Sequence, residues 1–139
     1  MVTIFYGNPK KRKVDTKHRI KVPIDFMEVI KGRHFIFFQY DPIVYTRYIN
    51  GSVMRCFPEY IYKGMTRNML RKPADDHERQ EFFLAEKSII DAQNRLTLKG
   101  PLSMLEHVIL AANGDVFDIY DPVNFPYKAH TLDEDQNGT

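Results

Sequence analysis

A five-residue pattern that begins with aspartate and ends with arginine occurs twice in this chain and constrains its fold more than any other feature. Residues 15–19 read Asp-Thr-Lys-His-Arg, and residues 91–95 read Asp-Ala-Gln-Asn-Arg. Each copy runs directly into a stretch in which apolar and polar residues alternate, residues 20–23 and 96–98. Alternation with a period of two predicts a strand that buries one face. We therefore expect a duplicated unit in which a turn introduces a short strand.

The duplication extends to a predicted hairpin in each unit. In the second unit the turn contains Asn113-Gly114, and Asn-Gly between apolar runs is the strongest short-range hairpin signal. Half-domains of this size cannot bury a core alone, so we expect the two units to complete each other. The predicted strands are 34–38 and 43–45 about a turn at 39–42, and 107–110 and 116–120 about a turn at 113–115.

Composition is that of one soluble domain with a real core. The chain has 139 residues, of which 43% are hydrophobic and 13% aromatic. Cys56 is the only cysteine, which excludes an internal disulfide and a cysteine metal site, and we expect it to be a small buried residue. No apolar run has the length of a membrane span, and the apolar patch at residues 2–6 is too short for a secretory signal. We expect a cytoplasmic protein with no membrane partner.

Positive charge is concentrated at the beginning of the chain. The formal net charge is only +2, yet residues 1–33 carry nine Lys and Arg against three acids, and residues 115–139 carry six acids against Lys128. The run Lys10–Lys13 is explained equally by a solvated strand edge that lysines protect from aggregation and by contact with phosphate; a nuclear localisation signal is a weaker alternative. An anionic partner is favoured because the run lies beside Lys17 and Arg19.

The two repeated turns have the residues that a tight turn without glycine requires. Asp15 can accept backbone N–H bonds two residues on, and His18 and Asn94 tolerate a positive φ. In the strands that follow, polar residues share one face and apolar residues the other. Each Asp and Arg could simply form an ion pair that braces its turn. In the first copy the surrounding lysines exceed what one aspartate can neutralise, so binding is favoured there.

Helices are expected between and within the units. We predict a short helix over residues 24–30 ending near Gly32, and Pro58 opening a helix over 59–71 whose stripe of Ile61, Met65 and Met69 packs inside the protein. A second connector helix is predicted from Asp75 or Asp76 through about Glu86, burying Phe82 and Phe83. The expected organisation of this α+β chain is a first unit 1–57, a helical connector 58–88, a second unit 89–126 and a disordered acidic tail 127–139.

No catalytic pattern is found. The five histidines are scattered, and the chain contains no H-E-x-x-H, C-x-x-C, phosphate-binding loop or nucleophile elbow. The acidic run at residues 75–78 could in principle supply metal ligands, but a capped, solvated helix start explains the same four residues without any metal and is favoured. We expect a protein without enzymatic activity, cofactor or metal.

Together these residues resemble the MraZ family of bacterial transcriptional regulators. The resemblance covers residues 4–125 and includes Phe5-Tyr6-Gly7, both Asp-x-x-x-Arg segments and the strands at 107–110 and 117–120. It implies a duplicated AbrB-like fold, that is, a double-psi or swapped-hairpin type β-barrel with connector helices, assembled into ring-shaped homo-oligomers. It also implies binding to short direct repeats in promoter DNA of the division and cell wall gene cluster, in association with the nucleoid.

The resemblance places the two Asp-x-x-x-Arg segments against DNA. Arg19 is the best candidate for a bidentate contact to guanine, and the neighbouring lysines would contact phosphate. Two departures from the family pattern are His18 and Asn94, where glycine is usual, and the later position of Pro101. The main alternative is an oligomeric protein-interaction scaffold that uses exposed aromatic residues. The candidate DNA-binding residues are Lys10, Lys11, Arg12, Lys13, Asp15, Lys17, His18, Arg19, Lys21, Asp91 and Arg95.

Overall fold

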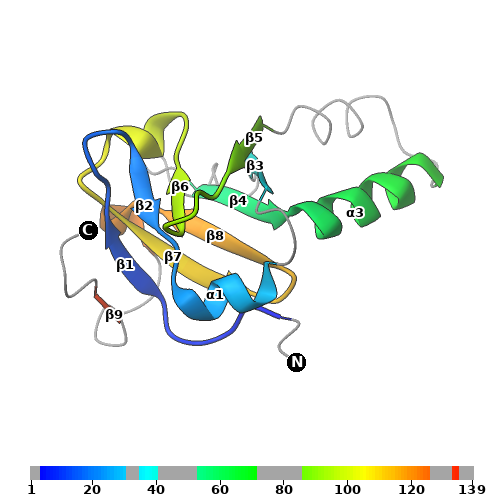
Figure 1. Cartoon of the computed structure of the whole chain (residues 1–139), viewed down its shortest axis with the longest axis horizontal. Helices are drawn as coiled ribbons and strands as arrows, with labels where there is room; N and C mark the ends of the chain where they lie inside the picture. The colour runs from blue at the N-terminus through cyan, green and yellow to red at the C-terminus, as the bar shows by residue number, and fades with distance from the viewer. Residues whose placement is uncertain (1–3, 31–34, 41–52, 72–85, 126–132, 135–139) are drawn as a thin grey trace.

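A two-stranded ribbon lies against the face of a larger sheet in the computed structural model (Figure 1). The structure describes residues 4–30, 35–40, 53–71, 86–125 and 133–134. Their strands are β1 Lys10–Lys13, β2 Arg19–Lys21, β3 Phe35–Tyr40, β4 Val53–Pro58, β5 Glu86–Ile89, β6 Arg95–Thr97, β7 His107–Asn113, β8 Val116–Tyr120 and β9 Asp133–Glu134. Their helices are α1 Ile24–Val29, α3 Glu59–Arg71 and the 3-10 turns η1 Pro101–Met104 and η2 Pro122–Asn124.

The larger sheet has the strand order β5-β3-β4-β8-β7-β1-β9, and β2 and β6 form the ribbon. All ladders are antiparallel except the pairing of β1 with β9. The prediction of a mainly β, α+β protein is confirmed. The closed barrel is not found among the described strands: the sheet ends at β5 and β9, because β2 and β6 pair with each other instead of joining its two edges.

Each half of the chain contributes one strand that pairs with a strand of the other half. β1 of the first half pairs with β7 of the second, with Lys13 opposite His107, and β5 of the second half pairs with β3 of the first, with Ile89 opposite Phe35. Exchanging the halves turns β5-β3-β4 into β1-β7-β8, so the sheet order is symmetric about the β4–β8 pair apart from β9. Each half therefore supplies strands that complete the other.

The main core lies between the ribbon and the sheet. Ile20 and Leu96 of the ribbon are 1% and 0% exposed and belong to one buried cluster with residues of β7 and β8. Rings of Phe5, Phe26 and Phe117 meet in this cluster, with centroids 5.0 to 5.3 Å apart. Such edge-on and tilted contacts are favourable geometries for aromatic pairs. The ribbon is thus held in place by apolar contacts on its inner face.

The predicted hairpin of the second unit is confirmed, with Gly114 at φ +70 in the turn between β7 and β8. The prediction of the first hairpin is partly wrong. Gln39 and Tyr40, predicted to lie in a turn, extend β3, whose partner is β4 rather than residues 43–45, which lie outside the described residues. Within the described part of the apolar patch at residues 2–6, Phe5 forms a bridge with Gly114, and Gly7 at φ +110 then turns the chain.

The predicted helices over residues 24–30 and 59–71 are confirmed as α1 and α3. The packing predicted for the stripe on α3 is wrong at Met65, which is 38% exposed, because α3 extends away from the sheet (Figure 1). Ile61 does pack, against the cluster of Phe57, Tyr62 and Val116.

Two predictions fail at the edges of the larger sheet. Glu86, predicted to end a second connector helix, instead begins β5, and the rest of that helix lies outside the described residues. Within the tail predicted to be disordered, Asp133–Glu134 pairs with β1, which otherwise has an open edge on that side. The backbone groups of such an edge attract a further strand.

Candidate nucleic-acid interface

The first repeated turn is closed by the carboxylate of Asp15. One oxygen, Oδ1, accepts hydrogen bonds from the backbone N–H groups of Lys17 at 2.9 Å and Arg19 at 2.8 Å. The other oxygen, Oδ2, accepts from Nε of Arg19 at 2.9 Å. His18 adopts φ 63, the conformation that its residue type was expected to tolerate. The predicted Asx-turn is confirmed.

The second turn has the same geometry. Asp91 Oδ1 accepts from the backbone N–H groups of Gln93 and Arg95, both at 2.9 Å, and Oδ2 accepts from Nε of Arg95 at 2.8 Å. Asn94 adopts φ 62. The ion pair considered as the structural role of each Asp and Arg is therefore present in both copies. It also fixes the direction in which each guanidinium projects.

These bonds set the charge state of the two turns. Partial burial raises the pKa of Asp15, but hydrogen bonds from Arg19 and Lys17 and the charge of Arg19 lower it more, so the pKa lies below the ordinary value of 3.8. Asp91 behaves in the same way: burial opposes the shift, and bonds from Arg95 and Gln93 lower its pKa below 3.8. Both carboxylates are ionised at neutral pH and hold their arginines.

The ribbon presents a polar outer face. In the β2–β6 ladder Arg19 lies opposite Thr97 and Lys21 opposite Arg95. Directly opposite residues of an antiparallel pair lie on the same side, so these four side chains share the face that is turned away from the core. Lys21 is exposed and the other three are partly exposed, whereas the alternating apolar residues are buried. The predicted separation of polar and apolar faces is confirmed.

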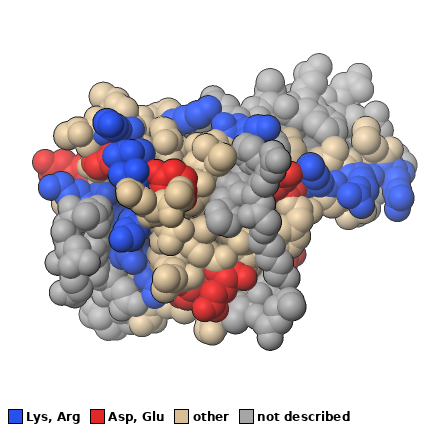
Figure 2. Space-filling view, viewed as in Figure 1, with Lys and Arg blue, Asp and Glu red and all other residues tan. Residues whose placement is uncertain are grey.

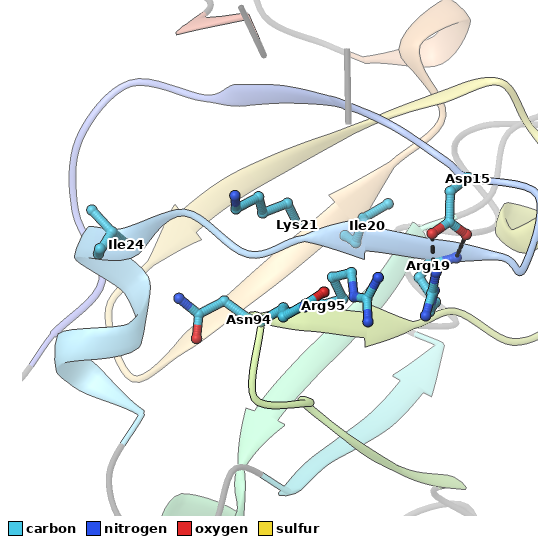
Figure 3. A pocket seen from close by; sticks show the side chains of 8 residues that line it. Asp15, Arg19, Ile20, Lys21, Ile24, Asn94 and Arg95 are labelled. Carbon is cyan, nitrogen blue, oxygen red and sulfur yellow. Dashed lines mark hydrogen bonds and ion pairs between the residues drawn. The ribbon is translucent and has the colours of Figure 1, made fainter. Parts of the chain in front are cut away.

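A depression of about 670 Å³ lies over this face. Figure 3 shows Arg19 and Arg95 beside each other on neighbouring strands, with Asp15 bound to Arg19. The depression therefore collects cationic groups from both repeats. Its lining residues are Asp15, Arg19, Ile20, Lys21, Ile24, Gln93, Asn94 and Arg95.

The basic run on β1 is less available than the ribbon. The side chain of Lys10 is only 13% exposed, and its Nζ lies 3.9 Å from Oδ2 of Asp25. The guanidinium of Arg12 donates to the carbonyl of Lys11 at 3.0 Å. Lys13 is exposed. Figure 2 shows Lys and Arg gathered over β1 and β2, with a second group along α3. β1 thus adds positive charge beside the ribbon, with Lys13 its most accessible cation.

His18 contacts the η1 turn and does not line the depression. Its Nδ1 donates to the carbonyl of Ser103 at 2.8 Å, which ties the first turn to η1. Lys17 is exposed at the tip of the turn, and within the part of the chain that the structure describes it forms no ion pair. Of the predicted site residues, Asp15, Arg19, Lys21 and Arg95 line the depression, while Asp91 holds Arg95 from outside it.

No family model matches the chain, and a search of the curated proteins finds no match.

Sequence reasoning missed Gln93, Asn94 and Ile24 as lining residues. Asn94 and Gln93 were assigned to a turn, and only the register of β2 against β6 brings that turn beside Lys21. The signal that could have found them is the repeat itself, because residues at equivalent places in two paired copies meet at the ribbon. Lys99, at the end of the second polar face, is exposed and donates to the carbonyl of Lys87 at 3.1 Å.

The described residues lack two kinds of feature. No three His, Cys, Asp or Glu side chains come together there in a way that could hold a metal ion. The acidic run at residues 75–78 lies outside the described part. None of the described helices has the length and apolar character needed to cross a membrane.

Proposed function

We propose that this protein binds double-stranded DNA through the outer face of the β2–β6 ribbon and regulates transcription. The observation that carries the proposal is the convergence of Arg19, Lys21 and Arg95 on one accessible ribbon face, above a buried apolar face that holds it rigid. A site built on a rigid element positions its side chains better than a loop does.

The shape and chemistry of this surface suit the major groove. A two-stranded ribbon fits into the major groove, where arginine makes its most common specific contact, a bidentate pair with guanine. Asp15 and Asp91 bind the Nε atoms of Arg19 and Arg95, which leaves the terminal nitrogens of each guanidinium outside the ion pair. Lys13, Lys17 and Lys21 are exposed and would contact phosphate, which would supply salt-dependent affinity.

The wider proposal follows the MraZ resemblance. The protein would act as a regulator of the MraZ type, with an AbrB-like duplicated fold, a nucleoid location in the cytoplasm and no enzymatic activity. The exchange pairing of the two halves supports a swapped-hairpin arrangement. Ring-like homo-oligomers binding short direct repeats would gain occupancy by avidity, since each ribbon alone supplies few contacts.

Fluorescence anisotropy tests the proposal. The full chain is titrated into labelled promoter DNA from upstream of its own gene and into a scrambled duplex of equal length, each at two salt concentrations. We expect tighter binding to the promoter at both salts and a steep loss of affinity as salt rises. Equal or absent binding to both duplexes would refute a sequence-specific regulator.

A protein-interaction scaffold is the second candidate, and α3 favours it. This helix extends from the body and exposes Tyr60, Met65 and Leu70, the last at 63%. The aromatic residues first considered for such a surface, at positions 37, 38, 40, 45 and 48, have side chains outside the described part. Association through exposed apolar side chains should change little with salt, which separates this candidate from DNA binding.

A further inference from the structure

The ribbon has a local two-fold symmetry that follows from its register. Arg19, Ile20 and Lys21 of the first repeat correspond to Arg95, Leu96 and Thr97 of the second. Exchanging the repeats turns the pair Arg19–Thr97 into the pair Arg95–Lys21, and leaves the pair Ile20–Leu96 in place. The local axis therefore passes between Ile20 and Leu96, perpendicular to the ribbon.

Hydrogen bonds at both ends of the ribbon are related by the same two-fold symmetry. The N–H of Val22 donates to the carbonyl of Asn94 at 2.8 Å, and the N–H of Leu98, its counterpart, donates to the carbonyl of His18 at 2.7 Å. The ion pairs of Arg19 and Arg95 also match, at 2.9 and 2.8 Å. The two arginines are consequently presented in equivalent local geometries on opposite sides of the axis.

Duplex DNA has two-fold axes of its own, perpendicular to its helix axis. Proteins with a two-fold axis bind sites whose palindromic sequence mirrors that symmetry. A ribbon seated in the major groove with its axis on a DNA dyad would direct Arg19 to one strand and Arg95 to the other. Each arginine would then meet a guanine at the same distance from the centre of the site.

The cations around the two arginines break this symmetry. Lys17 and Lys21 of the first repeat correspond to Gln93 and Thr97 of the second. Because Lys21 lies opposite Arg95 whereas Arg19 lies opposite Thr97, the two sides of the axis carry different cations for phosphate contact. The base readout is symmetric and the backbone attraction is not, which gives the bound chain a preferred orientation.

We infer that a single chain reads a short pseudo-palindromic DNA element, with Arg19 and Arg95 each recognising a guanine in one half and the Ile20–Leu96 pair on its centre. This inference rests on the proposed function and specifies its target. A symmetric element within each binding unit is compatible with direct repetition of that unit along a promoter.

The test is in vitro selection from a randomised duplex library with the full chain and two variants, Arg19→Lys and Arg95→Lys. Lysine keeps the positive charge but cannot form the bidentate contact with guanine. It therefore disturbs phosphate affinity and the ion pair with the aspartate of the turn less than a neutral residue would. Arg67→Lys on α3 is the matched control, and circular dichroism checks that all variants fold.

We expect the unmodified chain and the control to select an element with internal two-fold symmetry. Arg19→Lys should lower base discrimination about tenfold at one half of the element, and Arg95→Lys at the mirror position. An element without internal symmetry, or loss of discrimination at the same position in both variants, would overturn the inference while leaving DNA binding intact. Failure to enrich any sequence, with no affinity for duplex DNA, would instead refute the proposed function together with the inference.

Discussion

Ile20 and Leu96 lie directly opposite each other in the β2–β6 ribbon, and both are completely buried against the larger sheet. They occupy equivalent positions in the two repeats, so their contact joins the two halves of the chain at the centre of the ribbon. Each repeat contributes one of these residues to the same buried cluster. The polar face that carries Arg19 and Arg95 is held by this apolar contact behind it.

Leu96→Ala tests how much the ribbon contributes to stability. Removing the larger part of a fully buried leucine leaves a cavity, and we expect the free energy of unfolding to fall by about 2–5 kcal/mol. Ile20→Val is the milder companion, with an expected loss of about 0.5–1.5 kcal/mol. Urea unfolding followed by circular dichroism measures both. A loss under about 1 kcal/mol for Leu96→Ala would mean that the ribbon is not part of the core.

Several of these features could be predicted from the sequence because they depend on local chemistry. The Asx-turns, the positive φ at His18 and Asn94 and the Asn113-Gly114 hairpin follow from residues a few positions apart. The extent of β3 and the start of β5 at Glu86 could not, since both strands depend on partners far along the chain. The depression likewise required the register of β2 against β6, which brings Gln93 and Asn94 beside Lys21.

Two glycines should respond oppositely to substitution by alanine. Gly64 lies inside α3 with nothing within 4 Å of an added Cβ, so Gly64→Ala should stabilise the protein by about 0.5–1 kcal/mol. Gly114 has equally open surroundings but φ +70, so Gly114→Ala should destabilise it by about 1–2 kcal/mol. Thermal melts of the two variants provide the comparison. The same sign of change in both would refute the conformations assigned to these positions.

Acid should release the two arginines. The folded pKa values of Asp15 and Asp91 lie below 3.8, so their contribution to stability is complete above that pH and is lost as the pH falls through the lowered values. Carboxyl ¹³C chemical shifts followed by NMR should give both midpoints below 3.8 in the folded chain and near 3.8 in urea. Folded-state midpoints at or above 3.8 would contradict the hydrogen bonds described for the turns.

The single thiol should be unreactive in the folded protein. Cys56 is 0% exposed, as the sequence predicted, and burial, assisted by the nearby charge of Asp118, raises its pKa well above 9.0. Because the thiolate is the reactive form, iodoacetamide at neutral pH should label Cys56 only after denaturation. Mass spectrometry before and after addition of guanidinium measures this. Rapid labelling of the native chain would show that β4 is open to solvent.

The central claim is that the ribbon face binds DNA, and the most direct test compares two double variants that each remove two exposed positive charges. Lys17→Ala with Lys21→Ala removes cations from the ribbon and its first turn, whereas Arg67→Ala with Arg71→Ala removes them from α3, away from the ribbon.

Fluorescence anisotropy with promoter DNA at moderate salt gives the affinity of each double variant. We predict that the ribbon variant loses about tenfold or more in affinity and that its salt dependence becomes shallower by about two phosphate contacts, while the α3 variant binds like the unmodified chain. Equal losses in both variants, or a loss confined to α3, would contradict the account.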